Sequence, residues 1–210
     1  DLSLWRSTIE TVAQWGVSHL SCYMLTVEPG TPMERAVERG TLVVPSDEET
    51  VEMYELAIAL LGRSGFHRYE IYNWAKPGRE SSHNLTYWRN QGYLAIGAGA
   101  AGYWNGIRYK LAPGVGGFIK GVRSGQVPLS EHEEIDRHRE MSESLILGLR
   151  LVEGVSAAGF RERFGAAPED EFAEALDWAE GAGLLERGGD VLRLTGRGVL
   201  LSNELFQRLL

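Results

Sequence analysis

The sequence contains one cysteine, Cys22, among its 210 residues. A single thiol cannot form an internal disulfide, and it cannot supply the several thiolates of an iron–sulfur or zinc site. Because Cys22 stands in an apolar stretch, we expect it to be a small buried hydrophobic residue rather than a reactive thiol.

Long apolar runs and targeting signals are also lacking. The sequence has no run of the roughly 20 apolar residues that a bilayer-spanning helix needs, and no signal-peptide pattern. We therefore expect a cytoplasmic protein. The chain starts with Asp1, directly before a predicted helix and without an initiator methionine, so we interpret it as a piece of a longer protein.

The remaining composition, with 43% hydrophobic and 24% charged residues, is typical of a globular chain and excludes a collagen-like, coiled-coil or largely disordered protein. The net charge of −8 arises in residues 130–210, which hold 9 basic and 17 acidic residues, whereas residues 1–129 hold 12 of each. The change in charge coincides with a change in predicted secondary structure. We expect two domains, 1–129 and 130–210.

Residues 66–128 combine positive charge with aromatic rings. They hold eight basic residues against Glu70 and Glu80, and 11 of the chain's 20 aromatic residues. This combination suits a planar anionic ligand, because flat rings stack on aromatic faces and carboxylates or phosphates pair with arginine. Nucleic acid fits the same pattern, and so does a β-rich core with a basic rim.

The first domain is predicted to alternate between helix and strand. The expected elements are a helix at 3–15, a strand at 18–27, helices at 32–39 and from 46 to 65, and a strand at 66–74. Ser46 and Glu49 form a capping box at the start of the third helix. This order is typical of β/α units on a parallel sheet, and it predicts an α/β fold.

The end of the first domain is less regular. Residues 75–91 lack periodicity and are predicted to be a long, functional loop. Residues 93–102 resemble a buried strand that runs into a glycine-rich turn, and a helix is expected at 115–124.

The second domain is predicted to be a winged-helix-like α+β domain. The expected elements are helices at 130–150, 156–164 and 168–182, strands at 184–187 and 190–194, and a last helix from about Gly196. Such domains often bind DNA through their third helix. Here residues 168–182 carry six acidic residues and no lysine or arginine, so they would repel phosphates, and we expect no DNA binding.

Two segments of the first domain carry the candidate chemistry. In His83-Asn84-Leu85-Thr86-Tyr87-Trp88, the imidazole could ligate a metal or haem iron or act as an acid–base group; a hydrogen-bonded loop histidine is the simpler interpretation. The run Gly97-Ala98-Gly99-Ala100-Ala101-Gly102 would allow a ligand to approach the backbone. It lacks the acidic residue about 20 positions on that a dinucleotide fingerprint requires.

Four segments in register resemble a known family. They are S-C-Y-M-L-T-V-E-P-G-T-P at 21–32, Y-E-I-Y-N-W-A-K-P-G at 69–78, H-N-L-T-Y-W-R at 83–89 and the glycine run at 97–102. Their order and spacing resemble the later half of radical S-adenosylmethionine (SAM) proteins related to oxygen-independent coproporphyrinogen III oxidase. The H-N-x-x-Y-W form is similar to the haem-chaperone branch of that family.

The resemblance implies the later half of a partial (β/α) radical SAM barrel in residues 1–129. It implies a [4Fe–4S] cluster and SAM, with the cluster's cysteine loop lying upstream of Asp1. It further implies haem as ligand and a haem-accepting protein as a partner. The residues implied to contact the tetrapyrrole are His83, Asn84, Tyr87, Trp88, Arg89 and Tyr103, and those implied to contact SAM are Thr26, Gly97, Gly99 and Gly102.

One position departs from the family pattern. Tyr103 stands where the haem-chaperone branch usually has a histidine, which leaves His83 as the main candidate for iron. Phenolate ligation by Tyr103 is chemically possible. Two other functions stay open: oxidative decarboxylation of coproporphyrinogen III by an adenosyl radical, and nucleic-acid binding through residues 66–128.

Overall fold

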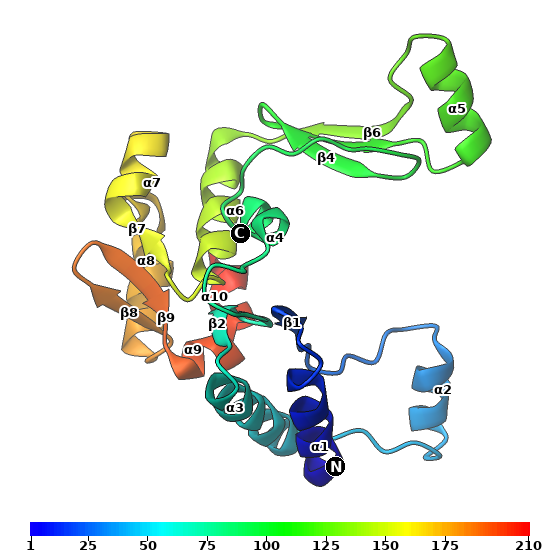
Figure 1. The fold of residues 1–210 in the computed structure, drawn as a ribbon. Coiled ribbons are helices and arrows are strands. Elements are labelled where there is room, and N and C mark those ends of the chain that lie inside the picture. Colours follow the sequence, from blue (N-terminus) through cyan, green and yellow to red (C-terminus); the bar gives the residue numbers. More distant parts are fainter. The chain divides into compact units, whose positions relative to one another are not determined.

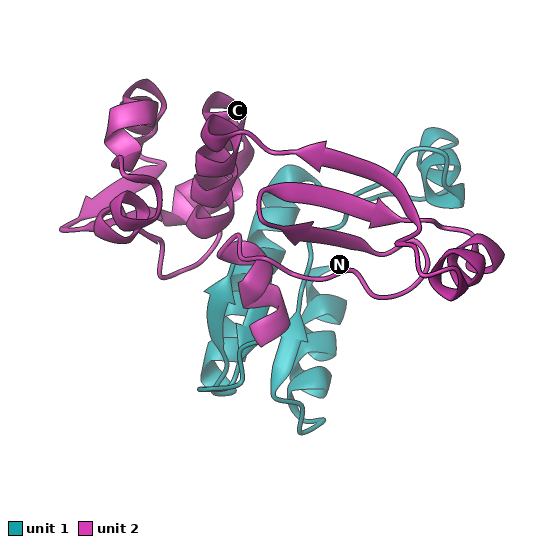
Figure 2. Cartoon of the chain, turned by 90° about the horizontal axis from the view of Figure 1, so that it is seen from above, with its two compact units in different colours: residues 1–81 teal, residues 82–210 magenta.

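The computed structural model describes residues 1–210 and divides them into two compact units, residues 1–81 and residues 82–210 (Figure 2). The units are described separately. Both contain helices and strands, which confirms the mixed α/β class. No helix is long and apolar enough to cross a membrane.

Unit 1 contains three helices and three short strands (Figure 1). In chain order these are α1 (Leu2–Ala13), β1 (His19–Ser21), α2 (Pro32–Glu38), α3 (Asp47–Arg63), β2 (His67–Glu70) and β3 (Asn73–Ala75). The capping box at the start of α3 is confirmed, because Ser46 Oγ accepts from the Glu49 amide and the Glu49 carboxylate accepts from the Ser46 amide. Helices α1 and α3 pack together, and the Trp5 indole donates to the Met53 carbonyl at 2.8 Å.

The strand pairing in unit 1 corrects the expectation of a parallel sheet. The strand order is β1-β3-β2, and both ladders are antiparallel. Only Ile71 and Tyr72 join β2 to β3, and so short a connection allows only antiparallel pairing. Strands β1 and β2 both run opposite to β3, so they run parallel to each other, although β3 separates them. Strands β1 and β2 therefore have the relative direction that consecutive strands of a β/α unit have.

The carboxylate of Glu70 is fully buried in the turn between β2 and β3. It accepts hydrogen bonds from the Tyr72 amide at 2.9 Å and from Asn73 Nδ2 at 2.7 Å, and Asn73 Oδ1 in turn accepts from Ser21 Oγ at 2.6 Å. Arg68, the basic residue two positions before Glu70, donates to the Tyr54 hydroxyl. Glu70 therefore joins the turn to β1.

Replacing Glu70 with alanine is expected to destabilise unit 1 by about 2–4 kcal/mol, because the amide donors of Tyr72 and Asn73 would lose a charged acceptor while buried. Chemical denaturation of the full-length protein would measure the loss. Glu55→Ala, at an exposed position of α3, is the control and should change little. Equal stability of the two variants would contradict this role of Glu70.

Unit 2 begins with a helix, a three-stranded meander and a further helix. These elements are α4 (Ser82–Trp88), β4 (Ala101–Trp104), β5 (Ile107–Leu111), α5 (Val115–Arg123) and β6 (Leu129–Glu134). The strand order is β4-β5-β6, with both ladders antiparallel, and α5 connects β5 to β6 (Figure 1). Asn105 and Gly106, with φ of 50° and 76°, form the two-residue turn between β4 and β5.

Three sequence expectations in this region are wrong. Residues 82–88 form α4 rather than a loop, and residues 93–100 form no continuous strand, since only Tyr93 makes a bridge. The helix expected over 130–150 is split: residues 129–134 form β6, and α6 starts after the N-cap Asp136 rather than after Ser130. The cross-strand pairs of Glu131 and Glu133 with the basic side chains of β5 outweigh the helix propensity of this acidic run.

The rest of unit 2 has the expected winged-helix outline. Its elements are α6 (Arg137–Leu149), β7 (Val155–Ser156), α7 (Ala157–Phe164), α8 (Pro168–Gly181), β8 (Leu185–Gly188), β9 (Val191–Leu194), α9 (Gly196–Leu200) and α10 (Ser202–Leu209). The hairpin β8–β9 forms the wing, and β7 pairs with β9. One hydrophobic core joins the helices to this sheet, and its least exposed members include Leu145, Leu176, Ala179 and Leu205. The predicted domain boundary at residue 129 stays a prediction.

Candidate functional site

Helix α4 carries the His83–Trp88 motif and ends in a tightly defined turn. The Asn90 amide donates to the Tyr87 carbonyl and the Gln91 amide to the Thr86 carbonyl, both at 2.9 Å, which is the Schellman pattern of a helix C-terminus. Asn90 takes the left-handed conformation that this turn requires, with φ of 47°, and its side chain is buried. The conformation of Asn90 therefore sets where the chain goes after α4.

His83 and Tyr87 lie on one face of α4, four residues apart. Their rings meet edge to face with centroids 4.8 Å apart, and the Tyr87 ring meets that of Tyr93 at 4.4 Å. The His83 side chain is exposed, whereas the two tyrosines are partly buried. The three residues form an aromatic row with an accessible imidazole at one end.

Sequence reasoning missed Tyr93. It lies beyond the turn at Asn90, so only the fold brings its ring to Tyr87. Burial raises the pKa of the Tyr93 phenol, which keeps this ring neutral.

Tyr103, which the sequence suggested as a second iron ligand, supports the row from β4. Its amide and carbonyl exchange hydrogen bonds with those of Tyr93 at 3.0 and 2.7 Å, and its phenol is hydrogen-bonded to the Glu140 carboxylate. Burial, followed by the charge of Glu140, raises the pKa of Tyr103. A neutral phenol with 5% exposure is poorly suited to phenolate ligation of iron.

Trp88 and Arg89 also make contacts outside the aromatic row. Since successive helical residues are about 100° apart, Trp88 lies about 140° around the axis from His83. The Arg150 guanidinium stacks 4.6 Å from the Trp88 ring centre, and the buried Trp88 indole nitrogen has no hydrogen-bond partner. Arg89 pairs with Glu153 at 3.1 Å. Both Trp88 and Arg89 line a cavity of about 470 Å³ next to α6 and α7. Asn84, next to His83 in the sequence, is half-buried.

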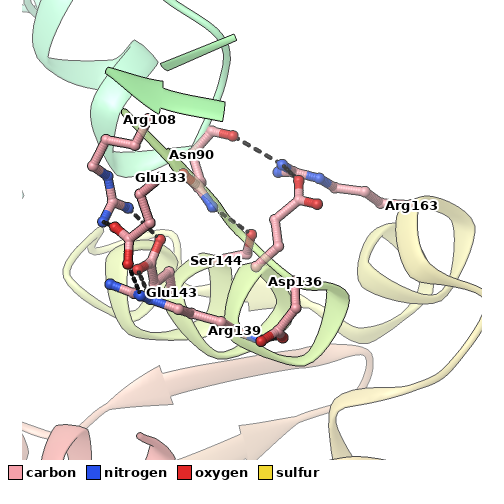
Figure 3. A network of polar contacts seen from close by, with 9 residues as sticks. Asn90, Arg108, Glu133, Asp136, Arg139, Glu143, Ser144 and Arg163 are labelled. Atoms are coloured by element: carbon pink, nitrogen blue, oxygen red, sulfur yellow. Dashed lines mark hydrogen bonds and ion pairs between the residues drawn. The ribbon is translucent and has the colours of Figure 1, made fainter. Parts of the chain in front are cut away.

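The meander that contains Tyr103 is fixed to α6 by a network of ion pairs (Figure 3). Arg108 of β5 pairs with Glu143 at 2.6 Å, and Arg139 bridges Glu133 of β6 and Glu143 at 2.5 and 3.0 Å. The pKa of Arg139 is raised, first by its hydrogen bond to Glu133. This network joins the aromatic row to the winged-helix part of unit 2.

The residues expected to contact SAM lie in both units. Thr26 is exposed in the segment after β1, and the glycine run belongs to unit 2. Gly97 and Gly99 have positive φ angles, and at Gly102 a Cβ atom would lie 2.4 Å from the Tyr109 ring of the neighbouring strand. Backbone conformation and packing therefore account for these glycines, while a SAM contact stays a prediction.

Most basic groups of residues 66–128 are bonded within the protein. Arg68 donates to a tyrosine hydroxyl and Lys76 to the Ser64 carbonyl, while three others have carboxylate partners: Arg89 with Glu153, Arg108 with Glu143, and Lys110 with Glu131. Carboxylates thus offset three of the eight basic charges of this segment.

The donor set of this chain does not fit a [4Fe–4S] cluster. No group of three or more histidine, cysteine, aspartate or glutamate side chains could hold a metal ion. Cys22 is half-buried beside a cavity of about 200 Å³, and burial raises the pKa of its thiol. A protonated single thiol cannot provide the ligands of such a cluster.

Comparison with known proteins places these features in a family. Residues 135–201 match the HemN C-terminal domain. The proteins named heme chaperone HemW from Bacillus subtilis and Mycobacterium tuberculosis H37Rv are 36% and 38% identical to this chain, respectively. The two alignments cover 95% and 100% of this chain, and 52% of each relative. The chain belongs to the HemN-like radical SAM family.

Further matches agree with this assignment. The Danio rerio protein named radical S-adenosyl methionine domain-containing protein 1, mitochondrial, is 34% identical over 97% of the chain and 47% of that relative. The solved structure of Escherichia coli coproporphyrinogen III oxidase (HemN), described as a radical SAM enzyme, has the same fold, with a TM-score of 0.72 at 16% identity over 99% of this chain and 51% of that one. The chain spans about half the length of the HemN-like proteins it matches. The family resemblance read from the sequence is confirmed.

Proposed function

We propose that the protein is a haem chaperone, which binds haem at the His83–Tyr87–Tyr93 row and delivers it to an acceptor protein. The observation that carries this proposal is the exposed imidazole at the end of an aromatic row, in a chain whose relatives include proteins named heme chaperone. A neutral imidazole is a common axial ligand of haem iron. Aromatic rings beside it offer flat apolar contacts to the macrocycle.

The exposure of the site favours transfer over enclosed catalysis. His83 lies at the surface, so a bound haem would keep one edge accessible to an acceptor. Arg89 is 46% exposed and its partner Glu153 59%, and a surface ion pair of this kind contributes at most about 1 kcal/mol. Arg89 could therefore exchange Glu153 for a haem propionate at low cost. Asn84 and Trp88 remain proposed neighbours of the tetrapyrrole.

The family implies a [4Fe–4S] cluster and SAM as cofactors. Since this chain lacks the thiolates, residues outside it would hold the cluster. Thr26, Gly97, Gly99 and Gly102 remain the proposed SAM contacts. A cytoplasmic location is part of the proposal.

Haem titration of the full-length protein tests the proposed function. We expect a saturable Soret change at one haem per chain, and transfer of that haem to apomyoglobin as a probe acceptor. The absence of a saturable change would contradict haem binding. Formation of protoporphyrinogen from coproporphyrinogen III in an anaerobic assay would instead support the oxidase function, and steeply salt-dependent retention of nucleic acid would support the binding-module function.

A further inference from the structure

The end of α4 is held by an arginine from a distant part of the sequence. Arg163, on α7, donates from Nη2 to the Asn90 carbonyl at 2.9 Å (Figure 3). Its Nη1 donates to the Arg89 carbonyl at 3.1 Å. Carbonyls at a helix C-terminus lack partners within the helix, and a guanidinium can satisfy two of them at once. Arg163 therefore acts as a side-chain cap of α4.

A second contact holds the same turn to α6. The buried Asn90 side chain donates from Nδ2 to Ser144 Oγ at 2.9 Å. Asn90 is thus held through its carbonyl by α7 and through its amide group by α6. Because its left-handed conformation is uncommon for a residue other than glycine, these two bonds help to keep the turn in one geometry.

Arg163 also reaches the other side of the aromatic row. Its Nη2 pairs with the Glu140 carboxylate at 2.8 Å, and Glu140 is the hydrogen-bond partner of the Tyr103 phenol. Tyr103 in turn holds Tyr93 through two backbone hydrogen bonds. One guanidinium therefore connects the end of α4, which precedes Tyr93 in the chain, with the strand that pairs with Tyr93.

We infer that Arg163 is a positioning residue for the proposed haem site, fixing the turn at Asn90 so that Tyr87 and Tyr93 stay in contact and His83 keeps its direction. This inference rests on the proposed function. It assigns the winged-helix part of the chain a role in that site: α7 supplies the residue that sets the geometry of α4, without touching the haem itself. Loss of a group that orients a metal ligand typically weakens metal binding by about 10- to 100-fold.

Arg163→Gln in the full-length protein tests the inference, with Arg163→Lys as the conservative variant. Arg161→Gln is the matched control, since Arg161 is an exposed arginine on the same helix. We expect Arg163→Gln to weaken haem binding by about tenfold or more and to change the Soret position and spin state of the bound haem. Lysine keeps the charge but cannot bond both carbonyls as a planar fork, so we expect incomplete rescue.

Hydrogen exchange provides a readout that needs no haem. In Arg163→Gln, faster amide exchange confined to residues 82–93 would support the inference, even if the wild-type protein bound no haem and the proposed function failed. Unchanged amide exchange at residues 82–93 in Arg163→Gln would overturn the inference. If the wild-type protein binds haem, an Arg163→Gln variant with the same haem spectrum as the wild type would also overturn it. Faster exchange throughout α6–α10 with an unaltered spectrum would also overturn it, because Arg163 would then be only a structural residue.

Discussion

A His83→Ala variant is expected to lose the axial coordination of haem. The imidazole is the exposed end of the aromatic row, and no other predicted tetrapyrrole contact carries an imidazole. The affinity for haem should fall by more than the roughly 10- to 100-fold that loss of an outer-shell partner costs. The Soret change measured in the titration should become that of a weakly or non-specifically bound haem.

The control for this variant is His132→Ala. His132 is exposed on β6, opposite Tyr109, in the same unit of the chain. It should leave haem binding unchanged. Addition of free imidazole should restore part of the spectrum of His83→Ala, because it fills the vacated coordination position. A Soret change that survives His83→Ala unaltered would remove this residue from the site.

A Gly154→Ala variant is expected to lose much of the stability of unit 2. Gly154 lies between α6 and β7 with φ of 74°, and a Cβ atom there would lie 2.2 Å from the Leu192 carbonyl oxygen and 2.6 Å from Arg193 Cγ. The left-handed conformation costs an alanine about 1–2 kcal/mol. The overlap with a backbone atom of β9 adds about 1–3 kcal/mol, because the strand must shift.

The melting temperature of unit 2 should therefore fall by roughly 10–25 °C in Gly154→Ala, which calorimetry would measure. Gly181→Ala is the control: Gly181 is the last residue of α8 and has open space at its Cβ position. Alanine favours helices over glycine, so Gly181→Ala should leave the melting temperature unchanged or slightly higher. A melting temperature of Gly154→Ala equal to that of the wild type would contradict the packing described for β7 and β9.

Local signals in the sequence predicted much of the secondary structure. The capping box at Ser46 and Glu49 predicted the start of α3, and the glycine turn after Arg187 predicted the wing. One local signal was available but unused: Asn105-Gly106 is the residue pair that a two-residue hairpin favours, and it would have predicted β4 and β5.

Other elements depend on partners far along the chain. The acidic run at 130–134 has helix propensity, but it forms a strand because β5 presents Arg108 and Lys110 opposite Glu133 and Glu131. The antiparallel pairing in unit 1 depends on the short β2–β3 connection. This connection places β3 between β1 and β2, which the alternation of helix and strand in the sequence would pair directly.

The candidate site also combines features that the sequence predicts with features that depend on distant parts of the chain. The sequence by itself determined the family, the winged-helix outline and the presence of His83, Tyr87 and Trp88 in one motif. Only the tertiary structure separated Trp88 from the His83 face, added Tyr93 to the row, and placed Arg163, 73 residues from Asn90, at the end of α4. The physical reason is that helical periodicity and capping act within a few residues, whereas ring contacts and guanidinium–carbonyl bonds form between any residues that the folded backbone brings together.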